Sequence, residues 1–247
     1  GEYARQYRID DIIIAIATPK SDLTELLHAC VETGCRVRRY IVMQEAGSGQ
    51  GKMRDINIAD LLGREEKHLD MSEVQAMIAG RRVLVTGGGG SIGSEMCRQI
   101  MSFIPEKLVL YDISENYMYD LFFELKAKYG EIVKNTVELR VGSIRDVSTL
   151  EQVFEEFRPE IVIHAAAHKH VPLMEDSPEQ AVKNNVFGTW NVANCALKHG
   201  AKRFVMISTD KAVNPTNVMG ASKRMAEIVV EAMQKRSSTT QFTAVRF

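Results

Sequence analysis

The sequence predicts an α/β fold built on a doubly wound parallel sheet. Short apolar segments alternate with segments of helical spacing from Arg81 to Phe247. A glycine-rich turn joins the first of these apolar segments to the helix after it, and an acidic residue closes the next apolar segment. Regular alternation of strands and helices favours parallel strands with helices on both faces of the sheet.

Residues 1–62 contain one strand–helix–strand pattern. A strand is predicted over Asp11–Thr18, a helix with leucines at helical spacing over Ser21–Thr33, and a second strand over Arg36–Met43. This unit is too small to bury two sheet faces, so we expect the last part of a larger α/β domain. Gly47–Gly51 is predicted as a plain loop, because no strand leads directly into it and no Gly-Lys-Ser/Thr ends it. Asp55–Asp70 is predicted as a connector, and residues 63–80 as the linker between two domains.

Residues 81–247 carry the regular alternation and are predicted to form one domain. Each predicted strand is a short apolar run, as expected for strands that are covered on both faces. The strands are expected at Val83–Thr86, Leu108–Asp112, Val137–Val141, Ile161–His164, Phe204–Ser208 and Phe242–Phe247. The helices are expected at Ser91–Phe103, Glu115–Tyr129, Val147–Phe157, Pro178–His199 and Asn217–Lys235.

The composition is that of an ordinary globular protein. The 247 residues are 45% hydrophobic and 26% charged. A net charge of -1 gives no basic field, so we expect no nucleic-acid partner. Four cysteines without paired zinc spacing are too few for a disulfide scaffold, which favours a reducing, cytoplasmic compartment. No apolar run approaches the roughly 20 residues of a membrane span.

The turn after Val83–Thr86 has the spacing of a dinucleotide-binding loop. Gly87, Gly90 and Gly93 follow the pattern Gly-x-x-Gly-x-x-Gly. The three glycines permit a tight turn, a close approach of the backbone to a pyrophosphate, and close packing of helix on strand. Ser91 and Ile92 open the helix, whose free N–H groups and dipole favour phosphate.

Asp112 ends the next predicted strand, about 20 residues after the loop. A carboxylate at this position accepts a hydrogen bond from a ribose 2′-hydroxyl and repels a 2′-phosphate, which favours NAD over NADP. Strand, turn, helix and acid together predict a Rossmann-type NAD-binding domain over residues 81–247. The alternative is a glycine-rich turn that holds no ligand.

Four segments together resemble the extended short-chain dehydrogenase/reductases. They are Thr86–Glu95, His164–Glu175, Asn185–Thr189 and Ser208–Lys223. Within that family the sequence is similar, from about Ile9 to Phe247, to the membrane-type nucleotide-sugar 4,6-dehydratases of bacterial polysaccharide and glycoprotein biosynthesis. These enzymes act typically on UDP-N-acetylglucosamine.

The resemblance implies that residues 1–62 are the end of a Rossmann-like domain. It also implies a UDP-sugar substrate, a homo-oligomer, and a parent protein anchored at the cytoplasmic face of the bacterial inner membrane. The chain looks like a fragment of that parent, without its membrane helices and without the C-terminal part that grips the nucleotide-sugar. The fragment alone need not be active.

The resemblance also assigns chemical roles. The reaction oxidises carbon 4 of the sugar, removes water across carbons 5 and 6, and returns the hydride to carbon 6. Asp210 is implied as the acid for the departing hydroxyl, Lys211 as the base at carbon 5, and Thr209 as a partner of the carbon-4 hydroxyl. Lys223 is implied as a ligand of the nicotinamide ribose and as a cation that helps Lys211 act as a base. Met219 stands where most relatives have a tyrosine, and a thioether cannot transfer a proton. The base for the oxidation therefore stays open, with Asp210 as a candidate.

Further contacts are expected around these groups. Lys169 and His170 would face the sugar or its diphosphate, or else form a basic loop in solvent. His164, His168 and His170 lack a carboxylate or cysteine that would complete a tetrahedral set, so no metal site is expected. Cofactor contacts are expected from Ser143, Ile144, Ala165, Ala166 and Ala167, although relatives often have aspartate in place of Ser143.

Two other functions stay open on the sequence. A 4-epimerase of the same superfamily would normally retain the tyrosine and would not need the Asp210–Lys211 pair for an elimination. A non-catalytic NAD-binding module would need the glycine loop alone. Asp210 and Lys211 would then be a solvated pair in a loop, and Met219 an ordinary core residue.

Overall fold

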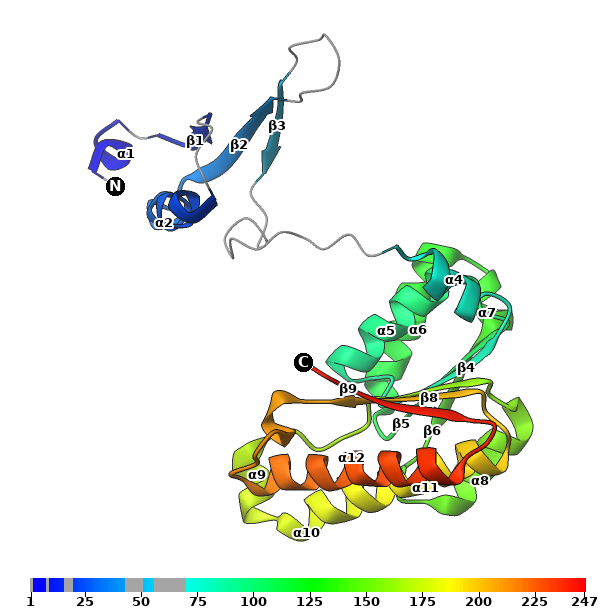
Figure 1. Ribbon diagram of the computed structural model, residues 1–247. Helices are drawn as coiled ribbons and strands as arrows, with labels where there is room; N and C mark the ends of the chain where they lie inside the picture. Colours follow the sequence, from blue (N-terminus) through cyan, green and yellow to red (C-terminus); the bar gives the residue numbers. More distant parts are fainter. Residues whose placement is uncertain (1, 8, 16–19, 43–50, 56–69) are drawn as a thin grey trace. The chain divides into compact units, whose positions relative to one another are not determined.

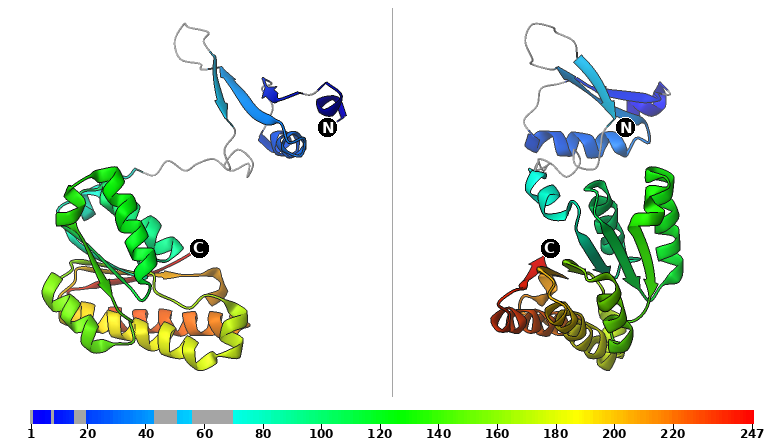
Figure 2. Two further views of the ribbon diagram at one scale, coloured as in Figure 1. Left: turned by 180° about the vertical axis from the view of Figure 1, so that it is seen from behind. Right: turned by 90° about the vertical axis from the view of Figure 1, so that its right-hand side faces the viewer.

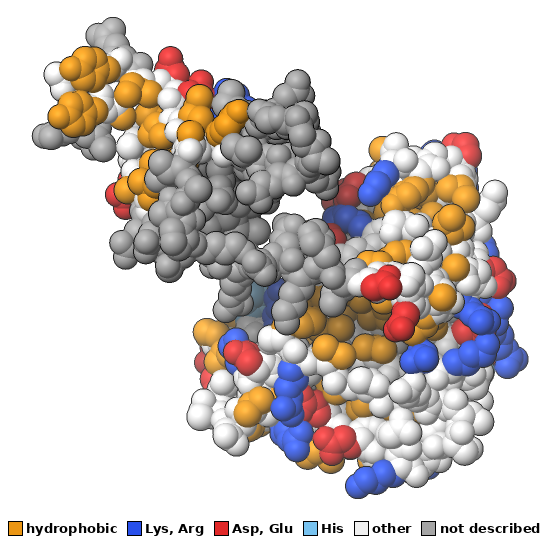
Figure 3. All heavy atoms as spheres, turned by 45° about the horizontal axis from the view of Figure 1, so that its top comes forward, with side chains coloured by type: hydrophobic (Ala, Val, Ile, Leu, Met, Phe, Trp, Pro, Cys, Tyr) orange, Lys and Arg blue, Asp and Glu red, His pale blue; other side chains and the backbone are white. Residues whose placement is uncertain are grey.

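The computed structural model describes residues 2–7, 9–15, 20–42, 51–55 and 70–247 (Figure 1). The chain divides into two compact units, Gly1–Asp70 and Met71–Phe247. Among the described residues no helix is long and apolar enough to cross a lipid bilayer. Side chains of both charge signs are interspersed on the face drawn in Figure 3.

The first unit is a small sheet with one long helix. Strand β1 pairs in parallel with β2, and β3 pairs antiparallel with β2. Ile14, Leu27, Cys30 and Val37 form a core between helix α2 and the sheet. The elements of this unit are α1 (Glu2–Gln6), β1 (Asp11–Ile14), α2 (Lys20–Val31), β2 (Arg36–Val42) and β3 (Gly51–Asp55).

The sequence predicted the strand–helix–strand pattern of this unit but missed β3. Gly51 was assigned to a loop and Asp55 to a connector, and both belong to the strand. The sequence of β3, Gly-Lys-Met-Arg-Asp, has no apolar run, and its strand conformation comes from pairing with β2. The predicted ends at Thr18 and Met43, residues 47–50 and residues 56–69 lie outside the described residues.

The second unit is built on a six-stranded parallel sheet in the order β6-β5-β4-β7-β8-β9. Numbered along this unit, that order is the 3-2-1-4-5-6 arrangement of the Rossmann fold. The strand order reverses between β4 and β7, and ligands of open α/β sheets bind at such a point. The predicted fold class is confirmed. The strands are β4 (Arg82–Thr86), β5 (Lys107–Asp112), β6 (Val137–Val141), β7 (Ile161–His164), β8 (Arg203–Ser208) and β9 (Gln241–Arg246).

Both faces of this sheet are covered by helices (Figures 1 and 2). Neighbouring residues of a strand point to opposite faces. Val83 and Val85 of β4 pack in one core with residues of α5 and α6, whereas Leu84 packs in the other core with residues of α8, α11 and α12. The middle residues of the central strands are therefore apolar on both faces, and the sequence shows them as short continuous apolar runs.

The predicted helices α5, α6, α8 and α12 begin and end within one residue of their predicted bounds. The predicted helix Pro178–His199 is instead α10, a π-helical segment (η1) and α11 in succession. Three short α-helices of this unit, α4, α7 and α9, were missed, and α4 lies within the interval 63–80 that was expected to be a linker. Helices of five to seven residues are too short to give a clear apolar period. The helices are α4 (Ser72–Ile78), α5 (Ser91–Ser102), α6 (Glu115–Tyr129), α7 (Ile132–Thr136), α8 (Val147–Phe157), α9 (Val171–Asp176), α10 (Pro178–Ala181), η1 (Val182–Gly188), α11 (Thr189–Lys198), η2 (Asp210–Ala212) and α12 (Val218–Arg236).

A buried histidine links the sheet to the start of α11. His164, the last residue of β7, is 1% exposed. Its Nδ1 atom lies 2.7 Å from Thr86 Oγ1, and its Nε2 atom lies 2.9 Å from Thr189 Oγ1. Burial, together with the positive charge of Lys223, lowers the pKa of His164 to about 3. His164 is therefore neutral in the folded protein near neutral pH.

We predict that His164 makes the folded protein sensitive to acid. Below pH 6.5 the unfolded chain binds a proton at His164 that the folded chain excludes until about pH 3. Stability therefore falls as the pH is lowered through this range, by up to about 2 kcal/mol between pH 7 and pH 5. Denaturant unfolding should show that the free energy of unfolding falls less between pH 7 and pH 5 in His164→Asn than in the wild type. His170→Asn is the matched control. Equal losses in His164→Asn and the wild type would contradict the prediction.

Candidate active site

The glycine loop after β4 lies directly against the chain after β7. Gly87 has a φ of +73°, and a Cβ atom there would lie 2.6 Å from Ala166 N and 2.7 Å from Ala165 C. A Cβ atom on Gly93 would lie 2.0 Å from Gly87 O. Side chains at these two positions would push the loop off the strand end or the helix off the loop. The loop and helix α5 therefore take the compact form that a dinucleotide pyrophosphate requires.

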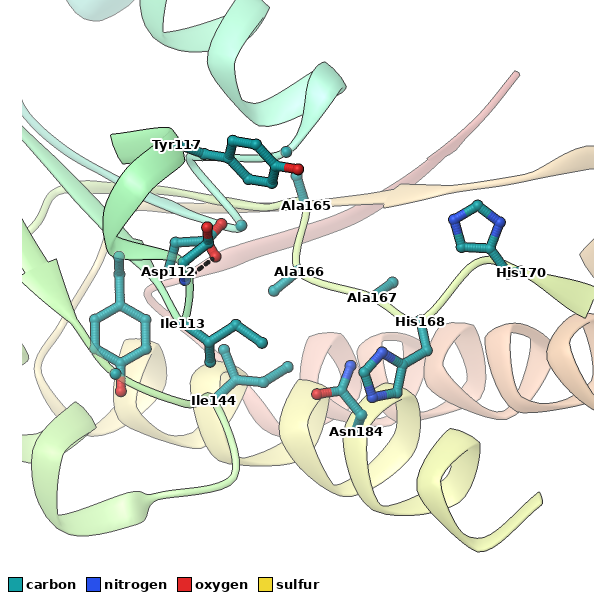
Figure 4. Close-up of a pocket in the computed structure, with 15 residues that line it drawn as sticks. Asp112, Ile113, Tyr117, Ile144, Ala165, Ala166, Ala167, His168, His170 and Asn184 are labelled. Atoms are coloured by element: carbon teal, nitrogen blue, oxygen red, sulfur yellow. Dashed lines mark hydrogen bonds between the residues drawn. The ribbon is translucent and has the colours of Figure 1, made fainter. Parts of the chain in front are cut away.

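The loop borders a cavity of about 470 Å³, here called the outer cavity (Figure 4). It lies at the carboxyl ends of β4, β5, β6 and β7, where the strand order reverses. The chain after β7 crosses the cavity as a run of alanines, which leaves room for a flat ligand against the backbone. The lining residues are Gly87, Gly90, Tyr111, Asp112, Ile113, Ser114, Tyr117, Gly142, Ile144, Ala165, Ala166, Ala167, His168, His170 and Asn184.

Asp112 is held in place at this cavity by two backbone donors. Gly89 N donates to Oδ2 at 2.9 Å, and Ser114 N donates to Oδ1 at 2.9 Å. A carboxylate has about four acceptor positions, so Asp112 keeps capacity for a ribose hydroxyl. The carboxylate therefore holds the glycine loop and α6 together while it offers an acceptor to a ligand.

A second cavity of about 240 Å³, here called the inner cavity, adjoins the first. Ala165, Ala167 and His168 line both cavities. A dinucleotide whose adenosine end fills the outer cavity can therefore reach the inner cavity along this shared wall. The other lining residues of the inner cavity are Ile92, Lys169, Ile207, Ser208, Thr209, Lys211, Met219, Lys223 and Phe247.

Thr209, Asp210 and Lys211 form the turn between β8 and α12. Thr209 Oγ1 donates to Asp210 Oδ1 at 2.9 Å and accepts from Lys211 N at 3.3 Å. Lys211 Nζ lies 3.5 Å from Asp210 Oδ1. The Asp210 side chain is 75% exposed and does not line the inner cavity, unlike Thr209 and Lys211. The hydrogen bond from Thr209 and the charge of Lys211 lower the pKa of Asp210, so its carboxylate is ionised near neutral pH.

Lys223 and Met219 enter the inner cavity from one face of α12. Lys223 is 6% exposed, and its Nζ atom donates to Ile207 O at 2.7 Å. Burial lowers the pKa of Lys223 to about 8, although Glu227 acts in the opposite direction. Met219 is buried, and its thioether can neither give nor accept a proton at the cavity.

The remaining predicted residues occupy the rim and supports of the two cavities. Lys169 lines the inner cavity, and its Nζ atom lies 3.4 Å from Ser91 Oγ at the start of α5. Ser143 is not among the lining residues: its Oγ accepts from Arg145 N, and its carbonyl accepts from Tyr111 Oη. Its neighbours Gly142 and Ile144 line the outer cavity instead.

The sequence missed several lining residues. Ile113 and Ser114 follow Asp112 directly, so their proximity in the chain was a usable signal. Tyr117 lies in the first turn of α6, is 65% exposed, and directs its ring towards the glycine loop and Ala165 (Figure 4). No sequence pattern marks Asn184 or Phe247 as lining residues, because only the tertiary fold brings η1 and the residue after β9 to the cavities.

The known proteins that this chain resembles are polysaccharide biosynthesis proteins and enzymes that act on nucleotide sugars. The family described as polysaccharide biosynthesis protein matches residues 83–247. The capsular polysaccharide biosynthesis protein CapD of Staphylococcus aureus is 42% identical over all of this chain and 41% of its own length. A UDP-N-acetylglucosamine 4,6-dehydratase (inverting) of Campylobacter jejuni is 31% identical over 69% of this chain and 49% of its own length. A UDP-glucose 4-epimerase of Rickettsia canadensis is 31% identical over the same two shares.

Solved structures agree with this relationship. The X-ray structure of Pen from Bacillus thuringiensis superposes with a TM-score of 0.62 at 32% identity, over 69% of this chain and 52% of that one. The chain spans about two fifths of the length of CapD and about half of the dehydratase and the epimerase. The match over residues 83–247, the strand order and the glycine loop lead to one conclusion: the chain belongs to the polysaccharide biosynthesis protein family of extended short-chain dehydrogenase/reductases.

Proposed function

We propose that residues 81–247 bind NAD and form part of an enzyme that dehydrates a UDP-N-acetyl-hexosamine, UDP-N-acetylglucosamine in particular, to a 4-keto-6-deoxy sugar nucleotide. The observation that carries this proposal is the pair of adjoining cavities. The outer cavity offers Asp112 and a glycine loop, and the inner cavity offers Thr209, Lys211 and Lys223. The 4,6-dehydratase among the relatives supports the same reaction.

The outer cavity fits NAD. The loop at Gly87 and the start of α5 would hold the pyrophosphate, and Asp112 would accept from the adenosine ribose. A 2′-phosphate beside the Asp112 carboxylate would be repelled, which favours NAD over NADP. NAD, when bound, would accept a hydride from carbon 4 of the sugar and return it to carbon 6. Lys223, on the wall of the inner cavity, would contact the nicotinamide ribose.

The protein's own side chains would move the protons. Asp210 begins ionised, so it would take the proton of the carbon-4 hydroxyl during the oxidation, while Thr209 donates to or accepts from that hydroxyl. Lys211, which must first be in its neutral amine form beside the cationic Lys223, would then remove the proton from carbon 5. Asp210 would give its proton to the carbon-6 hydroxyl, which leaves as water, and Lys211 would return its proton to carbon 5. Protons taken and given thus balance within the Asp210–Lys211 pair.

Met219 supports this order of events. The usual tyrosine base is absent from α12, and the buried thioether of Met219 cannot replace it. The exposed carboxylate of Asp210 is free to meet a substrate that approaches from solvent. One group can serve as the first base and then as the acid, because the proton that it collects is the one that it later delivers.

An epimerase is the second candidate function, because UDP-glucose 4-epimerases are also among the relatives. Epimerisation at carbon 4 requires no elimination, so it leaves the pair Asp210 and Lys211 without a role. A non-catalytic NAD-binding module is a third candidate, and it would need the outer cavity alone.

Incubation of a full-length protein containing this chain with UDP-N-acetylglucosamine and NAD separates the three. The expected product is a 4-keto-6-deoxy sugar, whereas carbon-4 inversion alone would favour the epimerase and an unchanged sugar the module.

The surface of α11 and α12 favours a homo-oligomer. These helices pack on each other, and Phe187, Trp190, Met225 and Ile228 on η1, α11 and α12 expose apolar side chains at i, i+3 spacing. A second copy covering these side chains would remove them from water.

The proposal also places the parent protein at the cytoplasmic face of a bacterial inner membrane. In support, one relative is an uncharacterised membrane protein of Methanocaldococcus jannaschii, 41% identical over 68% of this chain.

We predict that Asp210→Asn and Lys211→Met each lower turnover of the full-length protein by about 100-fold or more, because each removes a proton-transfer group. The rate of 4-keto-6-deoxy product formation measures this. Asp120→Asn on α6 and Lys198→Met on α11 replace exposed residues of the same types and should leave the rate near that of the wild type. Near-normal turnover in both Asp210→Asn and Lys211→Met would refute the assignment.

We predict that Asp112→Asn weakens NAD binding about tenfold or more, because a hydrogen bond to a charged acceptor contributes about 1.5–3 kcal/mol. The preference for NAD over NADP should shrink as well, since the repulsive charge is gone. Titration calorimetry with both dinucleotides measures the two effects on the 247-residue chain. Asp120→Asn is again the control, and an unchanged NAD affinity in Asp112→Asn would rule out the ribose contact.

A further inference from the structure

A buried carboxylate beside the inner cavity has no part in the proton transfers above. Glu227 lies on α12, one turn after Lys223, and is 2% exposed. Ser208 Oγ and Arg246 Nε each donate to Oε1 at 2.7 Å, while Arg246 Nη2 and Arg224 Nη1 donate to Oε2 at 2.5 Å and 2.9 Å. Burial acts to raise the pKa of Glu227, but its hydrogen bonds to Arg246, Ser208 and Arg224 lower it to about 2. Glu227 is therefore a buried anion at neutral pH.

This carboxylate joins three elements at the candidate active site. Ser208 is the last residue of β8 and comes directly before Thr209. Arg246 is the last residue of β9, and the carbonyl of the next residue, Phe247, accepts from Asp210 N at 3.1 Å. Both strands that support the Thr209–Lys211 turn are thus bound to one side chain of α12.

Glu227 also acts on the charge of Lys223. The ammonium group of Lys223 is buried against Ile207 O, and a buried cation needs an opposite charge nearby to stay protonated. Glu227 supplies that charge: Lys223 binds Ile207 O and Glu227 binds Ser208 Oγ, so the two side chains meet at consecutive residues of β8. Asp210, the acid of the adjoining turn, has its side chain 75% exposed and hydrogen bonded to Thr209. The other titratable groups around Lys223 are His164 on β7, which is neutral, and His168, Lys169 and Lys211 on the wall of the inner cavity.

We propose that Glu227 is a positioning residue of the candidate active site, which holds the ends of β8 and β9 beneath the Thr209–Lys211 turn and keeps Lys223 charged. The catalytic meaning of this inference rests on the proposed function. Its electrostatic part concerns Lys223 itself and can be measured without turnover.

The test is the titration of Lys223 in protein labelled with ¹³C at the lysine ε carbons, with Lys223→Arg used to assign the signal. Glu227→Gln keeps the size of the side chain and removes its charge, so the titration midpoint of Lys223 should fall by about one pH unit or more. Arg246→Gln removes a cation beside Glu227 and should raise the midpoint. Glu231→Gln is the matched control, because Glu231 lies one turn further along α12, also pairs with Arg224, and is exposed.

A midpoint of Lys223 that stays at the wild-type value in folded Glu227→Gln would overturn the proposal. If Glu227→Gln does not fold, Arg246→Gln provides the test. A titration midpoint of Lys223 that is unchanged or lowered in Arg246→Gln would also overturn the proposal. In the full-length enzyme, the alkaline limb of the kcat profile should move to lower pH in Glu227→Gln by the same amount as the midpoint. Expected shifts at Lys223 in a protein that turns over no sugar nucleotide would support the charge effect of Glu227 and count against the proposed function.

Discussion

The architecture of both cavities depends on one close contact between two backbones. The loop after β4 lies against the chain after β7, and only a hydrogen atom fits at Gly87 between it and Ala165 and Ala166. Ala165 N also donates to Thr86 O, which keeps the two strand ends together. Because the chain after β7 is the wall that the two cavities share, a side chain at Gly87 would disturb the dinucleotide pocket and the adjoining inner cavity at once.

Two carboxylates serve the cavities from opposite sides of the switch point. Asp112 is partly exposed, receives backbone donors, and keeps acceptor capacity for a ligand. Glu227 is buried, and the side chains of Ser208, Arg224 and Arg246 donate hydrogen bonds to it. The two carboxylates therefore have different roles. Glu227 is surrounded by donors of the protein and stabilises the scaffold, whereas Asp112 has free lone pairs and can bind a ligand.

The sequence revealed those parts of the site that are contiguous in the chain. Gly87, Gly90 and Asp112 stand at fixed distances from apolar strands, so spacing alone predicted where they would lie. Asn184, Phe247 and Glu227 reach the site through the packing of η1, β9 and α12, which no local pattern reports. The neighbours of Ser143, Gly142 and Ile144, line the outer cavity, whereas Ser143 itself does not. Strand β3 was not predicted because its sequence is polar and its strand conformation depends on pairing with β2.

The hydrogen-bond chain through His164 fixes which ring nitrogen carries the proton. Thr189 Oγ1 donates its hydrogen to Asn185 O at 2.6 Å, so it must accept from His164 Nε2. His164 is consequently the Nε2–H tautomer, and its bare Nδ1 accepts the hydroxyl hydrogen of Thr86. The hydrogen bonds thus run in one direction, from the strand that leads into the glycine loop to the carbonyl of the π-helical turn. Reversing any single link would leave two hydrogens or two lone pairs facing each other in a space that water does not reach.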